Sequence, residues 1–195
     1  MKKLLSLLFL CAMILNTGCE KRLFKTIVTY NFNETYTLTV DGRRDVPPTT
    51  ITRADLLDGL NIPDDAQITK VTIENVSAKV SENVEQSQAY FVNLEGFYVK
   101  PDGKKKLFPQ FPIPIASATF TRINNTIAED IQGLANQLSA ILLDENNTQS
   151  ASVELTVFTS SPLAIDLHFQ LGISVHYEVC REVAIIFGGG GEKCE

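Results

Sequence analysis

Apolar and polar residues alternate without interruption along the segment 163–179. Every odd-numbered residue from Leu163 to Val179 is apolar, whereas the even-numbered residues are polar or small. A period of two predicts a β-strand, because successive side chains of a strand point to opposite faces. One apolar and one polar face are typical of an antiparallel sheet that packs on a core on one side only. This segment therefore points to a β-rich fold.

Two neighbouring segments extend this pattern. Residues 24–40 alternate in the same way, with a candidate break at 31–34. Residues 151–159 precede the alternating segment 163–179, and Ser160-Ser161-Pro162 between them suits a turn. We therefore predict a hairpin formed by 151–159 and 163–179.

Three more strands are predicted from parity and from proline. The apolar residues of 68–80 change parity near Glu74-Asn75, as a β-bulge would require. Residues 90–99 are apolar on both parities, which predicts a central strand covered on both faces. Residues 107–115 contain three prolines and are predicted to form an edge strand.

Two segments have the spacing and the start signals of helices. Thr52 is placed to cap a short helix over about 52–60. Thr126 and Glu129 have the spacing of a capping box, and the apolar residues that follow recur at helical spacing over 126–143.

These elements predict a mainly β (α+β) protein, an antiparallel β-sandwich-like domain of about 7–9 strands with two helices. The length of 195 residues and the 44% hydrophobic content suit one globular domain, which we place at 24–187. No β–α alternation supports a parallel nucleotide-binding fold. We recognise no family in residues 24–187.

The first 18 residues have the layout of a secretory signal peptide. Lys2 and Lys3 precede an apolar run from Leu4 to Leu15 that is too short to span a bilayer as a stable helix. We therefore expect residues 1–18 to be removed in the mature protein.

The end of this segment, Asn16-Thr17-Gly18-Cys19, resembles the lipobox of bacterial lipoproteins. Thr17, Gly18 and Cys19 fit that pattern, whereas Asn16 stands where the family usually has Leu. The resemblance implies cleavage before Cys19, lipidation of its thiol, and a short tether over 19–23. Glu20 in place of Asp then favours the outer membrane, on its periplasmic or its surface face. The alternatives are an ordinary signal peptide cut nearby or an uncleaved anchor.

Cys180 and Cys194 remain once Cys19 is assigned to the lipid. An even pair in an oxidising compartment predicts a disulfide, and two free thiols or a metal pair are the alternatives. Closing this bond from a strand that ran unbroken to Phe187 would need a nearly taut return. We therefore expect the strand to break near Arg181-Glu182, ahead of a Gly-rich tail over 188–195.

Charge and composition exclude several classes of protein. Without Lys2 and Lys3, the 17 Lys and Arg become 15 against 23 Asp and Glu, a net charge of -8. An acidic chain lacks the basic footprint of a nucleic-acid binder.

His168 and His176 lie eight residues apart on one strand, so we expect them to face solvent and not to share a metal.

The remaining constellations are weak. Asp64-Asp65 and Glu129-Asp130 suit a solvated turn and a helix start, and Asp144–Asn147 is only a weak calcium loop. Lys104–Lys106 is expected at a solvated hairpin tip, with contact to anionic headgroups as the alternative. We predict no catalytic residues, no metal and no cofactor.

The sequence therefore predicts a non-enzymatic, lipid-anchored protein of the bacterial cell envelope with a binding or structural role. An accessory subunit of an outer-membrane assembly is the first interpretation, and a surface adhesin is the second. A carrier of a lipid or other apolar ligand, or an exported hydrolase, is the alternative. The expected partners are the membrane, through the lipid on Cys19, and an envelope protein.

Overall fold

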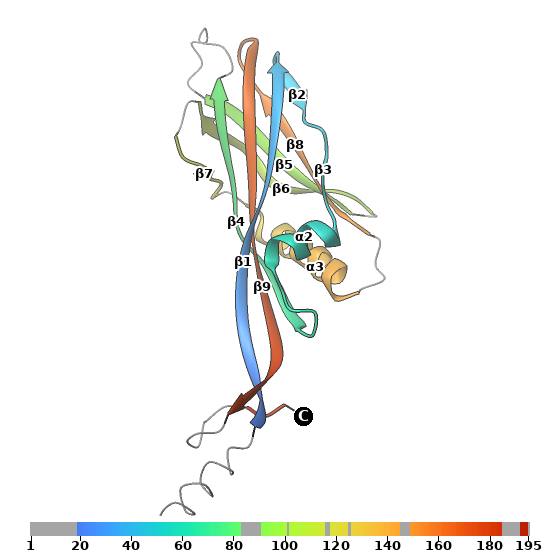
Figure 1. Ribbon diagram of the computed structural model, residues 1–195. Helices are drawn as coiled ribbons and strands as arrows, with labels where there is room; N and C mark the ends of the chain where they lie inside the picture. Colours follow the sequence, from blue (N-terminus) through green and yellow to red (C-terminus); the bar gives the residue numbers. More distant parts are fainter. Residues whose placement is uncertain are drawn as a thin grey trace, which may run out of the picture.

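The computed structural model describes residues 19–82, 91–100, 102–115, 118–124, 126–144, 149–184 and 192–194. Within these ranges the chain forms nine strands in two sheets and two helices. The strands are antiparallel, and one hydrophobic core lies between the sheets (Figure 1). The predicted mainly β, sandwich-like fold is confirmed.

The first sheet contains the two longest strands of the molecule. Its order is β1-β9-β4-β7, formed by β1 (Cys19–Val40), β9 (Leu163–Ala184), β4 (Gln67–Glu82) and β7 (Thr121–Arg122). β1 and β9 pair over their whole length without a register shift, so the candidate break at 31–34 is absent.

The second sheet is built from shorter strands. Its order is β2-β8-β5-β6, and β3 also pairs with β8. The bounds are β2 (Arg43–Asp45), β3 (Thr49–Ile51), β5 (Phe91–Lys100), β6 (Gly103–Pro114) and β8 (Ala151–Phe158). β6, with its prolines, lies at the edge as predicted.

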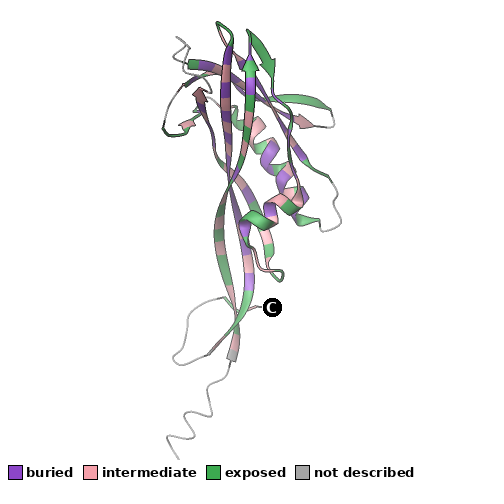
Figure 2. Cartoon of the chain, turned by 45° about the horizontal axis from the view of Figure 1, so that its top comes forward, coloured by how far each residue is buried: buried purple, intermediate pink, exposed green. Residues whose placement is uncertain are grey.

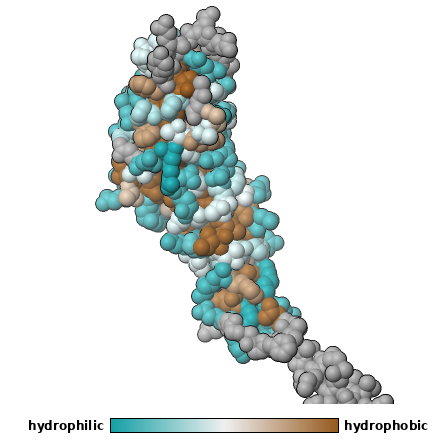
Figure 3. Space-filling model, turned by 90° about the vertical axis from the view of Figure 1, so that its left-hand side faces the viewer, coloured by the Kyte–Doolittle hydropathy of each residue, from teal (hydrophilic) through white to brown (hydrophobic). Residues whose placement is uncertain are grey.

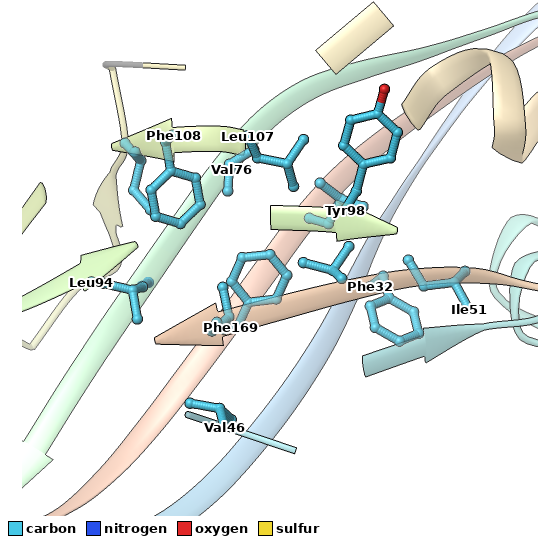
Figure 4. Packing of buried hydrophobic residues seen from close by; sticks show 14 of the residues in the cluster. Phe32, Val46, Ile51, Val76, Leu94, Tyr98, Leu107, Phe108 and Phe169 are labelled. Carbon is cyan, nitrogen blue, oxygen red and sulfur yellow. The ribbon is translucent and has the colours of Figure 1, made fainter. Parts of the chain in front are cut away.

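The core fills the space between the two sheets. Figure 4 shows side chains of both sheets in this space, among them Phe32 and Phe169 of the first sheet and Leu94 and Tyr98 of the second. All nine odd-numbered residues of β9 from Leu163 to Val179 are buried, so its predicted core face is confirmed. β5 is central as predicted, but it is covered mainly on one face, since Phe91 is 55% exposed.

Two helices lie below the second sheet in Figure 1, beside the middle of β1 and β9. α2 (Arg53–Leu60) begins at its predicted cap, where Thr52 and Asp55 form a capping box. α3 (Ala128–Leu143) buries Leu134, Leu138 and Ile141 against the sheets.

The capping box predicted at Thr126 does not form. Ile127 is the N-cap of α3, and no side chain caps that end. The backbone N–H of Ile127 donates to the carbonyl oxygen of Leu107 at 2.9 Å, which ties the chain to β6 at this point. This tertiary bond starts the helix one residue later and leaves Glu129 out of register with Thr126.

The predicted hairpin of 151–159 with 163–179 is wrong. β8 pairs with β5, β2 and β3, whereas β9 pairs with β1 and β4. The connection between them crosses from one sheet to the other. Alternation shows that each strand has a buried face but does not name the strand's neighbour, and here each sheet receives one of the two strands.

The bulge predicted near Glu74-Asn75 is confirmed. The register between β4 and β9 shifts between Ile73 and Asn75, and a second shift lies between Ile68 and Lys70. Each shift adds a residue to β4 without a partner on β9. The parity change in the sequence reflects this extra residue.

Candidate functional site

A two-stranded ribbon extends from the sandwich toward Cys19. β4 pairs with β9 only up to Glu178, so beyond that point residues 19–24 of β1 pair with 179–184 of β9 alone. We call these two segments the ribbon and the rest of the described chain the head. In Figure 2 the buried residues concentrate in the head, and the ribbon is mainly intermediate or exposed.

The ribbon corrects two expectations for this part of the chain. Residues 19–23, expected as a tether, are paired strand in the structure. β9 also passes through Arg181-Glu182 without a break, and its described part ends at Ala184. The break was expected because a strand to Phe187 would leave too little chain for the return. A strand that ends four residues past Cys180 leaves ten residues to cover a rise of about 13 Å.

The predicted disulfide closes the ribbon. Cys180 and Cys194 are bonded, with a Cα–Cα distance of 6.1 Å. The bond holds a short C-terminal segment beside β1, where Leu23 N–H donates to the Glu192 carbonyl oxygen at 3.0 Å. Residues 185–191, which include the four glycines of the expected Gly-rich tail, lie outside the described residues.

Ion pairs surround the ribbon. Glu20 pairs with Lys193 and with Arg22, the latter at 2.6 Å, and these cations lower the pKa of the Glu20 carboxyl. Lys25 lies 2.8 Å from Glu192. These groups are exposed or near the surface, so each pair adds little stability, although together they neutralise much of the charge there.

The outer face of the first sheet is a layer of polar side chains. Gln170 donates to the side chain of Asn33 at 2.9 Å and accepts from the hydroxyl of Ser77 at 3.1 Å. His168 Nδ1 lies 3.0 Å from Thr35 Oγ1. In Figure 3 the visible surface is hydrophilic or mixed, with hydrophobic side chains in small patches.

The two histidines lie apart, as the sequence predicted. His168 and His176 lie on one unbroken strand, which separates them by roughly 27 Å. Among the residues that the structure describes, no group of three or more His, Cys, Asp or Glu could hold a metal. Residues 145–148 of the weak calcium loop lie outside this description.

Two of the three lysines at the β5–β6 tip form ion pairs with carboxylates. Lys104 pairs with Glu154, and Lys106 Nζ lies 2.6 Å from Glu95. Lys106 Nζ also lies 5.5 Å from the centroid of the Phe97 ring. These neighbours suit a solvated hairpin tip.

β1 is an open edge of the first sheet. Above the ribbon, no strand pairs with its outer side within the described chain. Natural edge strands are protected by lysine, proline or bulges. From Thr26 to Val40 the strand has one charged residue, Glu34, no proline, and no register shift against β9. The odd-numbered side chains of this stretch are all exposed.

A cleft that the sequence did not predict lies between the helices and the start of β4. Its volume is about 840 Å³, and Arg53, Leu57, Ile62, Asp64, Leu142 and Leu143 contribute to its wall. α2, α3 and the 62–68 segment each supply part of that wall. No local pattern could predict it, since α3 is distant in the sequence from the other two segments.

Comparison with known proteins assigns no family. No family model matches the sequence, and no curated protein matches it. A structure of infectious bursal disease virus, Gx strain, aligns at 12% identity with a TM-score of 0.25, over 85% of this chain and 39% of the viral chain. A TM-score this low carries no argument about fold or function. No helix in the described part of the chain is long and apolar enough to cross a membrane.

Proposed function

We propose that this chain is a lipid-anchored protein of the bacterial cell envelope, and that its ribbon holds the head away from an outer membrane. The observation that supports this most is that Cys19, the residue that resembles the lipidated cysteine, is itself paired in β1, opposite Ala184. Force or motion at the lipid would reach the head through paired strands and a disulfide. Along the 22 residues of β1 the rise is about 70 Å.

The role we favour is that of an accessory subunit that binds an envelope protein. The open edge of β1 supports this role, because unpaired backbone groups on an edge accept a strand from a partner. The N–H of Leu23 donates to Glu192, on the side of β1 that faces away from β9. Because the N–H groups of a strand alternate in direction, those of the odd-numbered residues of β1 point to the open side. Bound in this way, a partner would lie alongside the head.

Labelling with a radioactive fatty acid tests the anchor. We expect the wild-type chain to carry the label and to sediment with membranes, and Cys19→Ser to do neither. Cys11→Ser is the matched control, since it removes a cysteine inside the signal segment. Label that persists in Cys19→Ser would overturn the proposal.

Crosslinking in intact cells tests the edge. Thr29 is exposed on β1, and His176 lies on the same outer face of β9. We expect Thr29→Lys to abolish a crosslinked species that the wild type forms, because lysine on an edge opposes strand addition. His176→Lys adds a lysine to a central strand and should retain the crosslinked species. Equal crosslinking by both variants would argue against the edge as the contact.

A further inference from the structure

The cleft beside α2 contains a cationic group without a partner. Arg53 lines the cleft, and its Nε is buried with no hydrogen-bond partner in the described part of the chain. Arg53 also forms no ion pair with any described residue. A buried guanidinium nitrogen that donates to nothing is costly unless a ligand or water accepts from it.

Aliphatic side chains line part of this wall, beside the polar residues Asp64, Asp65 and Gln67. Leu57 and Ile62 are half-buried, and Leu142 is buried. Leu143, at the end of α3, also lines the cleft and is 58% exposed. An alkyl chain in the cleft would cover these side chains and remove them from water.

The acidic residues of the 62–68 segment limit the negative charge that a ligand of this cleft can carry. Asp65 is held by Arg181, whose Nη2 lies 3.0 Å from its carboxylate. Asp64 is exposed and also lines the cleft, so it opposes a second negative charge. One arginine and the exposed carboxylate of Asp64 in the same lining suit a head group with a single negative charge.

We propose that this cleft binds a singly charged anionic amphiphile, with the head group on Arg53 and the alkyl chain against Leu57, Ile62, Leu142 and Leu143. The volume of about 840 Å³ lies within the range of small-molecule sites. A fatty carboxylate and a phosphodiester lipid share this chemistry. The inference is independent of the anchor and of the β1 edge.

Binding of laurate and of lysophosphatidylglycerol, measured by isothermal titration below their micelle concentrations, tests the proposal. The protein is the full chain with Cys19→Ser, purified without detergent. We expect at least one of the two probes to bind and Arg53→Gln to weaken it at least about tenfold. Arg44→Gln removes the same charge from an exposed position on β2 and should leave binding unchanged.

Dodecanol separates the head-group contact from the alkyl contact. Because dodecanol has no charge, it should bind to Arg53→Gln as tightly as to the parent protein. Leu143→Asp should weaken the binding of all three probes. Thermal melting of each variant shows whether the head remains folded. If neither anionic probe binds, or if Arg53→Gln binds them as tightly as the parent protein, the proposal is overturned.

Discussion

Gly133 of α3 lies against the phenol of Tyr98 on β5. A Cβ atom added at position 133 would stand 2.1 Å from the hydroxyl oxygen of Tyr98. Tyr98 is fully buried, so its ring has little room to move. The glycine therefore lets α3 approach the second sheet, although glycine is a poor helix former.

We expect Gly133→Ala to destabilise the protein by about 1–2 kcal/mol, because overpacking costs more than the gain in helix propensity. Urea denaturation would measure this. Tyr98→Phe removes the closest contact but leaves Cζ at 3.1 Å, so Gly133→Ala should destabilise less in that background. Equal effects in both backgrounds would show that the contact does not matter.

The two faces of the first sheet should differ in their tolerance of charge. Val175 is fully buried on the core face, so Val175→Asp should unfold the head, because an unpaired buried charge costs several kcal/mol. Thr29→Asp on the exposed face of β1 should change stability by less than about 1 kcal/mol. Similar melting temperatures for these two variants would contradict the assignment of faces.

Ser174 corrects a simpler expectation about the outer face. Its even position predicts a harmless Ser174→Asp change, but Ser174 is only 3% exposed. Its hydroxyl, after that of Thr72, lowers the pKa of the Glu74 carboxyl. We expect Ser174→Asp to place a second carboxylate beside Glu74 and to destabilise more than Thr29→Asp. Glu74→Gln in the same chain should recover part of the loss.

The disulfide should protect the ribbon more than the head. The chain-entropy model assigns about 3 kcal/mol to a loop of this size, but Cys180 lies beyond the three-stranded part of the sheet. We expect the Cys180→Ser, Cys194→Ser double variant to exchange the Leu23 amide hydrogen faster, with little change at Ile173. Reduced wild-type protein should behave in the same way. Unchanged exchange at Leu23 would show that the bond does not hold the ribbon closed.

Asp45 should contribute to stability only above its lowered pKa. The buried Thr156 hydroxyl donates to Asp45 Oδ1 at 2.8 Å and, with a smaller effect of Arg43, lowers the pKa of this carboxyl below its usual 3.8. The unfolded chain binds this proton more readily than the folded chain, so the contribution is present above about pH 3.8 and is lost as the pH falls through the lowered value.

Denaturation of Asp45→Asn as a function of pH tests this. The variant should be less stable than the wild type near neutral pH, and the difference should shrink as the pH falls below 3.8. Thr156→Val removes the donor of the same hydrogen bond. In that background the effect of Asp45→Asn on stability should depend less on pH. If the wild type and Asp45→Asn differed in stability by the same amount at every pH, protonation of Asp45 would not be linked to folding.

The buried face of β9, the edge position of β6 and the cap of α2 follow from the sequence. The alternation of 163–179 predicts which side chains of β9 are buried, the prolines of β6 predict an edge, and Thr52 predicts the start of α2. Each of these depends on a few neighbouring residues, because the period of a strand and the cap of a helix are local properties.

Only the tertiary structure decided which segments of the chain contact each other. β8 and β9 lie in different sheets, although the turn between them suits a hairpin. Ile127 and not Thr126 caps α3, because a backbone bond to Leu107 intervenes. The cleft at Arg53 exists only where α3 meets the distant segment that runs from α2 to the start of β4. Local patterns show that a strand needs a neighbour or a helix needs a cover, but which segment supplies it depends on contacts between residues far apart in the chain.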